Sequence, residues 1–195
     1  MKKLFYLLAI SASAFAFQGC NSGTKDAKEN ADSLNMAKDT TSNEMATGGI
    51  AVEPSDAEFA TKAAVGGMAE VELGKLALTK TTNPQIKEFA NMMVNDHGKA
   101  NAELMELAKV KNITLPTMVD DEHKKKMEDL QKKSGVEFDK AYTDAMVDGH
   151  ESTLKLMKDE ATDGKDGELK AFAGKTAPVV QTHLTMIETI KKSFK

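Results

Sequence analysis

Three histidines lie at positions where a helix of a soluble protein usually carries apolar side chains. His97, His150 and His183 each fall on an apolar stripe with a spacing of three or four residues, the pattern of one helix face. The stripes are Ile86, Ala90, Met93, His97, Ala100, Leu104 and Ala108; Thr143, Met146, Val147, His150, Leu154, Met157 and Ala161; and Phe172, Thr176, Val180, His183, Ile187, Ile190 and Phe194. Leaving a buried ring nitrogen unpaired costs about 1–3 kcal/mol. The pattern therefore predicts an internal polar site.

A glutamate of a fourth helix is expected to join this cluster. Glu70 and Glu72 occupy the middle of an earlier apolar segment, and each lies on a stripe that can face inward. The spacing favours Glu70 slightly and leaves Glu72 open. Imidazole with carboxylate suits zinc, iron, manganese or copper. The sequence predicts one divalent transition metal, with zinc, iron or manganese preferred, bound by Glu70 or Glu72 with the three histidines.

The histidines are expected to meet because each lies near the middle of its helix. Each is roughly 20 Å from the start of its helix at a rise of 1.5 Å per residue. The midpoints of long helices in a bundle stay level whether the helices run parallel or antiparallel. Asp96 and Asp148 lie close enough to these stripes to join the site or to orient a histidine from outside it.

Three other interpretations of these residues differ in how well the sequence supports them. The cluster can be a metal-free polar core in a structural or stress-related envelope module, with the histidines bonded to Glu70 or Glu72. A dinuclear iron centre is not supported, because Glu-x-x-His is absent and a valine precedes each histidine by three residues. Copper bound with help from Met93, Met146 and Met186 is a minor alternative, because methionine at this spacing usually packs the core.

Enzymatic machinery is not evident elsewhere in the chain. The sequence has no Gly-x-Ser-x-Gly motif, no phosphate-binding glycine loop and no dinucleotide fingerprint. His123 is surrounded by Asp, Glu and Lys and is expected to be solvated, outside the cluster. The formal net charge is -4 and basic residues form no stripe, so nucleic acid is not an expected partner. The sequence favours a binding protein over an enzyme and identifies no protein partner.

Four long helices account for residues 55–195. They are expected over residues 55–80, 84–111, 134–161 and 168–195, with Ser55 and Asn83 as N-caps and Pro84 in a first helical turn. A short helix over 120–132 lies in the second connection, which is long enough to run back along the bundle. These elements predict an all-α, ferritin-like four-helix bundle whose second and third long helices run parallel.

The N-terminal segment predicts export and membrane attachment. Lys2 and Lys3 precede an apolar run that is too short to span a bilayer, which is typical of a signal peptide over residues 1–19. The single cysteine, Cys20, follows Gly19 as in bacterial lipoproteins, where such a cysteine is lipidated; ordinary cleavage after Ala16 is the alternative. Residues 20–54 carry few large apolar side chains and are expected to form a flexible, disordered tether. The predicted location is the periplasmic face of the outer membrane, or the periplasm without lipidation.

Several motifs resemble a known family. They are the run Gly66-Gly67-Met68-Ala69-Glu70-Val71-Glu72-Leu73-Gly74, the run Met93-Val94-Asn95-Asp96-His97, the pair Leu115-Pro116, His150, and the segment from Phe172-Ala173 to His183. The chain from Ser55 to Lys195 resembles exported bacterial proteins with a ferritin-like helical domain of unknown function, often labelled outer membrane proteins. The resemblance implies a helical fold and an envelope location but no established activity. Gly149 separates Asp148 from His150, whereas Asp-His is often adjacent in the family.

Overall fold

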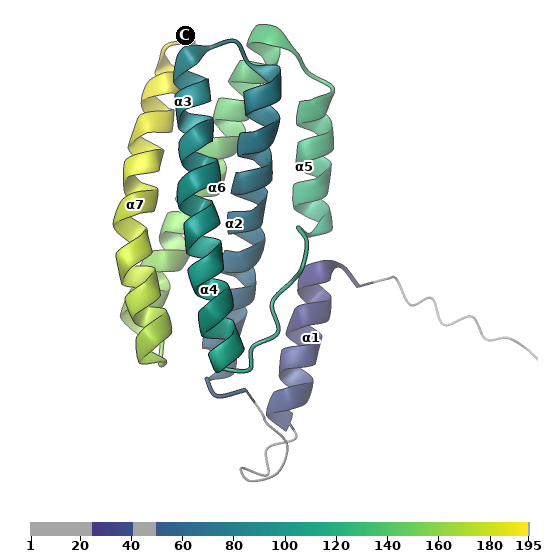
Figure 1. The fold of residues 1–195 in the computed structure, drawn as a ribbon, viewed down its shortest axis with the longest axis vertical. Helices are drawn as coiled ribbons and strands as arrows, with labels where there is room; N and C mark the ends of the chain where they lie inside the picture. The colour runs from purple at the N-terminus through teal and green to yellow at the C-terminus, as the bar shows by residue number, and fades with distance from the viewer. Residues whose placement is uncertain (1–24, 41–49, 195) are drawn as a thin grey trace, which may run out of the picture.

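The structure is a computed structural model that describes residues 25–40 and 50–194, and all regular secondary structure in these ranges is helical. The bundle consists of α2 (Pro54–Lys80), one continuous helix built from α3 (Pro84–Met92), the π-helical turn η1 (Met93–His97) and α4 (Gly98–Val110), then α6 (Gly135–Asp163) and α7 (Gly167–Lys192). Two shorter helices, α1 (Ala27–Thr40) and α5 (Asp121–Gln131), lie outside it (Figure 1). The predicted all-α bundle, with a short helix in the second connection, is confirmed.

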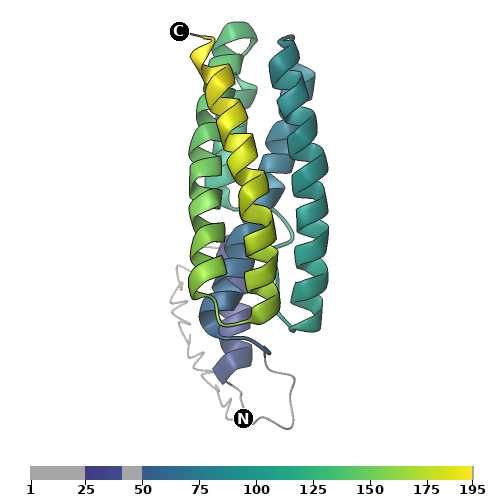
Figure 2. The same cartoon turned by 90° about the vertical axis from the view of Figure 1, so that its left-hand side faces the viewer.

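The connections make the second and third long helices run parallel. At one end of the bundle, Lys80 at the end of α2 donates to the backbone oxygen of Lys133, just before α6 begins. At the other end, Lys111 follows α4 and pairs with Asp166, just before α7. The helix α3–η1–α4 therefore runs parallel to α6, and the connection through α5 returns along the bundle (Figure 1). A single long crossover is the connectivity of ferritin-like bundles. Figure 2 shows α6 and α7 side by side along their length.

Local sequence explains where two of the long helices begin. The side chain of Asn83 accepts a hydrogen bond from the backbone N–H of Gln85 at 2.9 Å, so the predicted N-cap is confirmed. The predicted Ser55 cap is wrong, because α2 begins one residue earlier at Pro54, with Glu53 in the cap position and no side-chain cap. Proline suits this place because its φ is preset and its missing N–H would have no helical partner.

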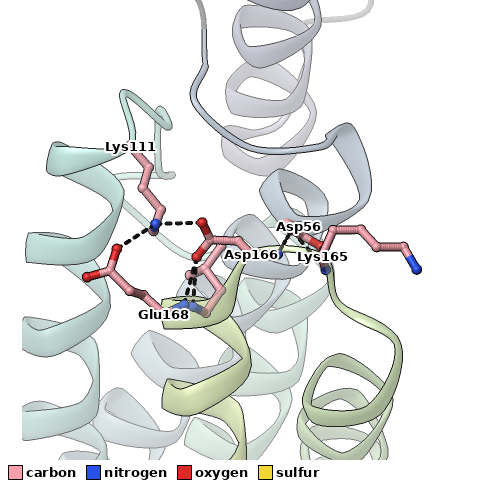
Figure 3. Close-up of polar contacts among 6 residues, drawn as sticks. Asp56, Lys111, Lys165, Asp166 and Glu168 are labelled. Carbon is pink, nitrogen blue, oxygen red and sulfur yellow. Dashed lines mark hydrogen bonds and ion pairs between the residues drawn. The ribbon is translucent and has the colours of Figure 1, made fainter.

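Buried charged groups tie three of the helices together at one end of the bundle (Figure 3). The Asp56 carboxylate, near the start of α2, accepts backbone N–H groups of Lys165 at 3.0 Å and Asp166 at 2.6 Å. Lys111, after α4, donates to Asp166 at 2.6 Å and to Glu168 at 2.8 Å. Asp56 and Lys111 are both buried, and their partners compensate for the loss of water.

The apolar core consists of two clusters with polar residues between them. One cluster gathers around Phe89, Phe138 and Tyr142, and the other around Phe59 and Phe172. On α2, Glu70 falls between residues of the two clusters, and His97 does so on the neighbouring helix. The bundle therefore has two apolar ends and a polar layer near its middle.

The predicted disordered tether over 20–54 is wrong for Ala27–Thr40, which form α1. This helix buries little apolar surface, and Ala31 is its buried apolar side chain. Polar pairing holds it instead: the Asn35 amide exchanges two hydrogen bonds with the backbone of Thr114, at 3.0 Å and 2.7 Å. Thr61 of α2 also donates to Asp32 at 2.6 Å. The composition of this segment predicted disorder because it contains few large apolar side chains. The contacts that hold α1 are polar, so the prediction failed there. The predicted signal peptide and Cys20 lie outside the described residues.

Candidate metal centre

The three predicted histidines meet in the middle of the bundle. The ring centroids of His97 and His183 are 5.2 Å apart, those of His97 and His150 5.5 Å, and those of His150 and His183 5.7 Å. One ring nitrogen from each histidine lies within 4.8 Å of the other two, and all three residues are buried. Among the described residues this is the one group of three or more potential ligands that close together. The predicted convergence of the midpoints is confirmed.

Glu70 on α2, the fourth long helix at this level, contacts two of the three histidines. Its Oε2 lies 2.7 Å from Nδ1 of His97, and its Oε1 lies 3.6 Å from Nδ1 of His150. The hydroxyl of Thr153 donates to Oε1 at 3.3 Å. Glu72 faces away from the cluster, because it is half exposed and pairs with Lys75 at 2.7 Å. Of the two glutamates left open by the sequence, only Glu70 reaches the histidines.

His150 has one nitrogen that nothing in the described structure satisfies. Its Nδ1 donates to the backbone carbonyl of Met146 at 2.8 Å, one turn earlier on α6. A carbonyl can only accept, so Nδ1 carries the hydrogen and Nε2 of the neutral ring carries the lone pair. His150 is fully buried, and this Nε2 has no hydrogen-bond partner. A free imidazole lone pair in a dry interior is an open position for a proton or a metal ion.

Asp96 and His97, adjacent residues of the π-helical turn η1, contact opposite nitrogens of the His183 ring. His97 Nε2 lies 3.3 Å from Nδ1 of His183, and Oδ2 of Asp96 lies 3.2 Å from Nε2 of the same ring. Asp96 and His97 both lie in this π-helical turn, where adjacent residues point less than the roughly 100° of a regular α-helix apart. Single π-turns within helices are frequent at functional sites. Sequence spacing did not predict η1, because the apolar stripe of this helix is compatible with an unbroken α-helix.

Burial and the neighbouring carboxylates shift the pKa values of the three histidines in different directions. Burial lowers the pKa of His97, but Glu70 raises it more, so the net pKa lies above the ordinary value. Burial raises the pKa of Glu70, yet the neighbouring His97 brings it below its ordinary value. Burial lowers the pKa of His150, and burial together with the other two histidines lowers that of His183 to about 4. Glu70 and His97 therefore form an ion pair beside two neutral imidazoles.

Once His97 gives up its extra proton, each of the three rings has one N–H held by an oxygen and one nitrogen free to bind a metal ion. Each histidine uses one nitrogen toward an oxygen acceptor: His97 toward Glu70, His150 toward the Met146 carbonyl and His183 toward Asp96. Oxygen acceptors of this kind orient the imidazoles of metal sites and fix their tautomers. Two nitrogens bound to one tetrahedral metal at about 2.0–2.1 Å lie roughly 3.3 Å apart. The separation of 3.3 Å between His97 Nε2 and His183 Nδ1 matches that spacing.

The remaining residues singled out by the sequence lie elsewhere. Asp148 is exposed on α6 and lines a surface groove, so of the two predicted aspartates only Asp96 touches a histidine. Met146 contacts the cluster through its carbonyl, and Met186 lines a different groove between α3 and α7. His123 lies on α5 outside the cluster, as expected, but it is 26 % exposed and paired with Asp120 rather than fully solvated.

A four-helix bundle with a buried three-histidine layer is the class of protein that these features define. The chain belongs to the family described as "Domain of unknown function (DUF4142)", which matches residues 37–190. No curated protein matches the sequence significantly. None of the described helices is long and apolar enough to cross a bilayer.

Two solved structures share the fold at low sequence identity. CopM in the Cu(I)-bound form matches with a TM-score of 0.61 and 14% identity over 71% of this chain and 96% of that chain. CopM in the Cu(II)-bound form matches with a TM-score of 0.61 and 13% identity over 72% of this chain and 97% of that one. At this identity the similarity establishes the helical fold only.

Proposed function

We propose that this protein binds a single transition-metal ion through one ring nitrogen each of His97, His150 and His183. The observation that carries the proposal is the buried Nε2 of His150, which has no partner while its Nδ1 is held by a carbonyl. Burying such a lone pair without a partner costs about 1–3 kcal/mol, and a metal ion would remove that cost. Glu70 and Asp96 serve as outer partners that hold the rings.

Copper is the first metal to test. The sequence alone favoured zinc, iron or manganese, and three imidazoles suit zinc and copper as well as iron. Proteins of the same fold have been solved with Cu(I) and with Cu(II), which supports copper before the others. The methionine sulfurs are not needed for this assignment, because the described contacts of Met146 with the cluster run through its carbonyl.

The proposed chemistry is binding rather than catalysis. Three protein ligands leave room for a fourth ligand, as in open metal sites. The surroundings are apolar, with Phe89 centred 5.7 Å from His150 and 6.4 Å from His183, which limits access of water. An enclosed site with few ligands is better suited to binding one ion than to turning over a large substrate.

The proposal includes a place in the cell envelope. The lysine-led apolar segment and Cys20 favour export and lipid attachment, so the partner of the N-terminus is a membrane and the bundle faces the periplasm. Globomycin treatment of expressing cells tests this attachment: accumulation of the unprocessed precursor supports lipoprotein maturation, and unchanged processing contradicts it.

Metal content of the full chain tests the binding site. Purified without chelator or affinity-tag metal and then offered Cu(II), the protein is expected to hold one copper per chain. His150→Phe, which keeps an aromatic ring without a ligand atom, is expected to hold none. His123→Gln removes a histidine outside the cluster and is the matched control. The contrary result is less than one equivalent of copper, zinc, iron and manganese in the unmodified protein and in both variants, with a higher melting temperature for His150→Phe. That result would instead make the cluster a metal-free polar core.

A further inference from the structure

A groove beside the cluster connects solvent with the residues that support the histidines. It has a volume of about 670 Å³ and is walled by α2, α5 and α6, with Lys28 of α1 at its edge. Glu70 and Met146 both line it. These are the residues that contact Nδ1 of His97 and Nδ1 of His150. The groove therefore ends at groups that touch the cluster directly.

His123 lines the same groove with one nitrogen held in place. Its Nδ1 lies 2.5 Å from Oδ1 of Asp120, which also accepts the backbone N–H of His123 at 2.9 Å. Because the carboxylate accepts, Nδ1 of the neutral ring carries the hydrogen and Nε2 keeps the lone pair. A carboxylate behind an imidazole is the arrangement that orients metal-binding histidines. The ring is only partly buried, so an ion from solvent can reach it.

Carboxylates accompany His123 along the groove. Glu122 and Asp148 line it, and both residues are exposed. Four lysines line it as well: Lys28, Lys62, Lys126 and Lys155. Glu70, Asp120 and Asp159 also line the groove, so five carboxylates nearly balance the four lysines and the net charge favours a cation only slightly. Attraction for a metal ion rests on ligand atoms, namely the imidazole nitrogen and the carboxylate oxygens.

We infer that this groove is the route by which the metal ion reaches the buried site, with His123 as the first ligand and Glu70 at its inner end. The inference rests on the proposed function. His123 belongs to no described group of three or more nearby ligand atoms, so it passes the ion inward rather than keeping it. The histidines of the core, which do form such a group, are the holding site.

Loading kinetics of the full chain with Cu(II) alone test the role of His123. Stopped-flow absorbance is expected to show His123→Gln loading severalfold more slowly than the unmodified protein, because the imidazole that first captures the ion is gone. The equilibrium dissociation constant and the melting temperature are expected to stay unchanged. Glu128→Gln is the matched control, because Glu128 is exposed on α5 and does not line the groove.

A second variant obstructs the groove without touching a ligand. A Cβ at Gly149 would have no atom within 4 Å, and Gly149 lines the groove, so Gly149→Leu adds an apolar side chain there. Copper binding and release are both expected to slow by the same factor, with an unchanged dissociation constant, because an obstruction on the route affects both directions equally. Gly174→Leu on α7 is its control, since a Cβ there approaches nothing closer than 3.9 Å.

The outcomes separate this inference from the proposed function. If the unmodified protein binds copper and both His123→Gln and Gly149→Leu load at its rate, the route is overturned while the binding site stands. If His123→Gln abolishes binding at equilibrium, His123 is a holding ligand and the route is again overturned. If the unmodified protein binds no metal, the proposed function and the route fail together.

Discussion

His97 Nε2 lies 3.3 Å from His183 Nδ1, although the two residues are 86 positions apart in the sequence. The far nitrogen of each ring contacts a carboxylate, Glu70 for His97 and Asp96 for His183. The rings are thus held from outside, and their near nitrogens face each other. Such an arrangement places ligand atoms before an ion arrives, which lowers the conformational cost of binding.

Replacing the outer carboxylate on α2 is expected to weaken metal binding without unfolding the protein. Glu70→Gln removes the charge that contacts His97 at 2.7 Å but keeps the side-chain shape. Loss of an outer partner typically costs about 10–100-fold in metal affinity, and we expect a Cu(II) affinity lower by that factor. Competition titration against a chelator of known affinity measures it. Glu72→Gln, two residues away and paired with Lys75, is expected to bind like the unmodified protein. Equal losses of Cu(II) affinity in Glu70→Gln and Glu72→Gln would contradict the assignment of Glu70 as the outer partner of His97.

Gly74 is expected to be essential to the packing of α2 against the neighbouring helix. A Cβ at this position would lie 2.9 Å from the backbone oxygen of Ala90 and 3.0 Å from Cβ of Met93, at the start of η1. Gly74→Ala should therefore lower the free energy of unfolding by about 1–3 kcal/mol through overpacking. Denaturant titration measures the change. Gly149→Ala, which has open space around it, should raise the free energy by about 0.5–1 kcal/mol through helix propensity.

Stability is expected to fall as the pH rises through about 7 because of Glu160. Burial, with Asp56 and Asp166 nearby, raises the pKa of this carboxyl from 4.5 to about 7. The folded state thus holds the proton more tightly than the unfolded state. The resulting stabilisation is fully present below pH 4.5 and lost as the pH rises through about 7.

The neutral variant Glu160→Gln tests this sign. Its melting temperature, measured from pH 5 to pH 8 by circular dichroism, should fall less over that range than that of the unmodified protein. Oε1 of Glu160 is buried without a partner, so ionisation there is not compensated. Glu151→Gln, on an exposed position of the same helix, should leave the original pH dependence intact. Parallel curves for the unmodified protein and Glu160→Gln would count against the raised pKa.

Docking of α1 is expected to depend on one amide. Asn35→Ala removes both hydrogen bonds to the Thr114 backbone and leaves those groups unpaired, at a cost of about 1–3 kcal/mol. Hydrogen exchange of the α1 amides should accelerate, while amides in α6 and α7 keep their protection. Asn30→Ala, at an exposed position of α1, is the control. Unchanged exchange in α1 would show that other contacts hold it.

The long helices and their connectivity could be predicted because their signals are local. Apolar spacing marked α2, α6 and α7, and the Asn83-Pro84 pair marked the start of α3. Composition failed for α1 because a polar helix without a large apolar face carries no periodic signal. The sequence predicted that α2 begins at Ser55 rather than at Pro54, because both residues are favourable at the start of a helix.

The histidine layer could likewise be predicted, because a polar ring on each of three apolar stripes is visible in the sequence. Sequence spacing could not choose between Glu70 and Glu72, since both stripes were apolar enough to face inward. It also could not find η1, the histidine that Asp96 contacts or the pairing of His123 with Asp120. These depend on how helices meet, at the scale of a single hydrogen bond. Periodicity describes which face of a helix is buried; only packing between helices sets which atoms on that face touch.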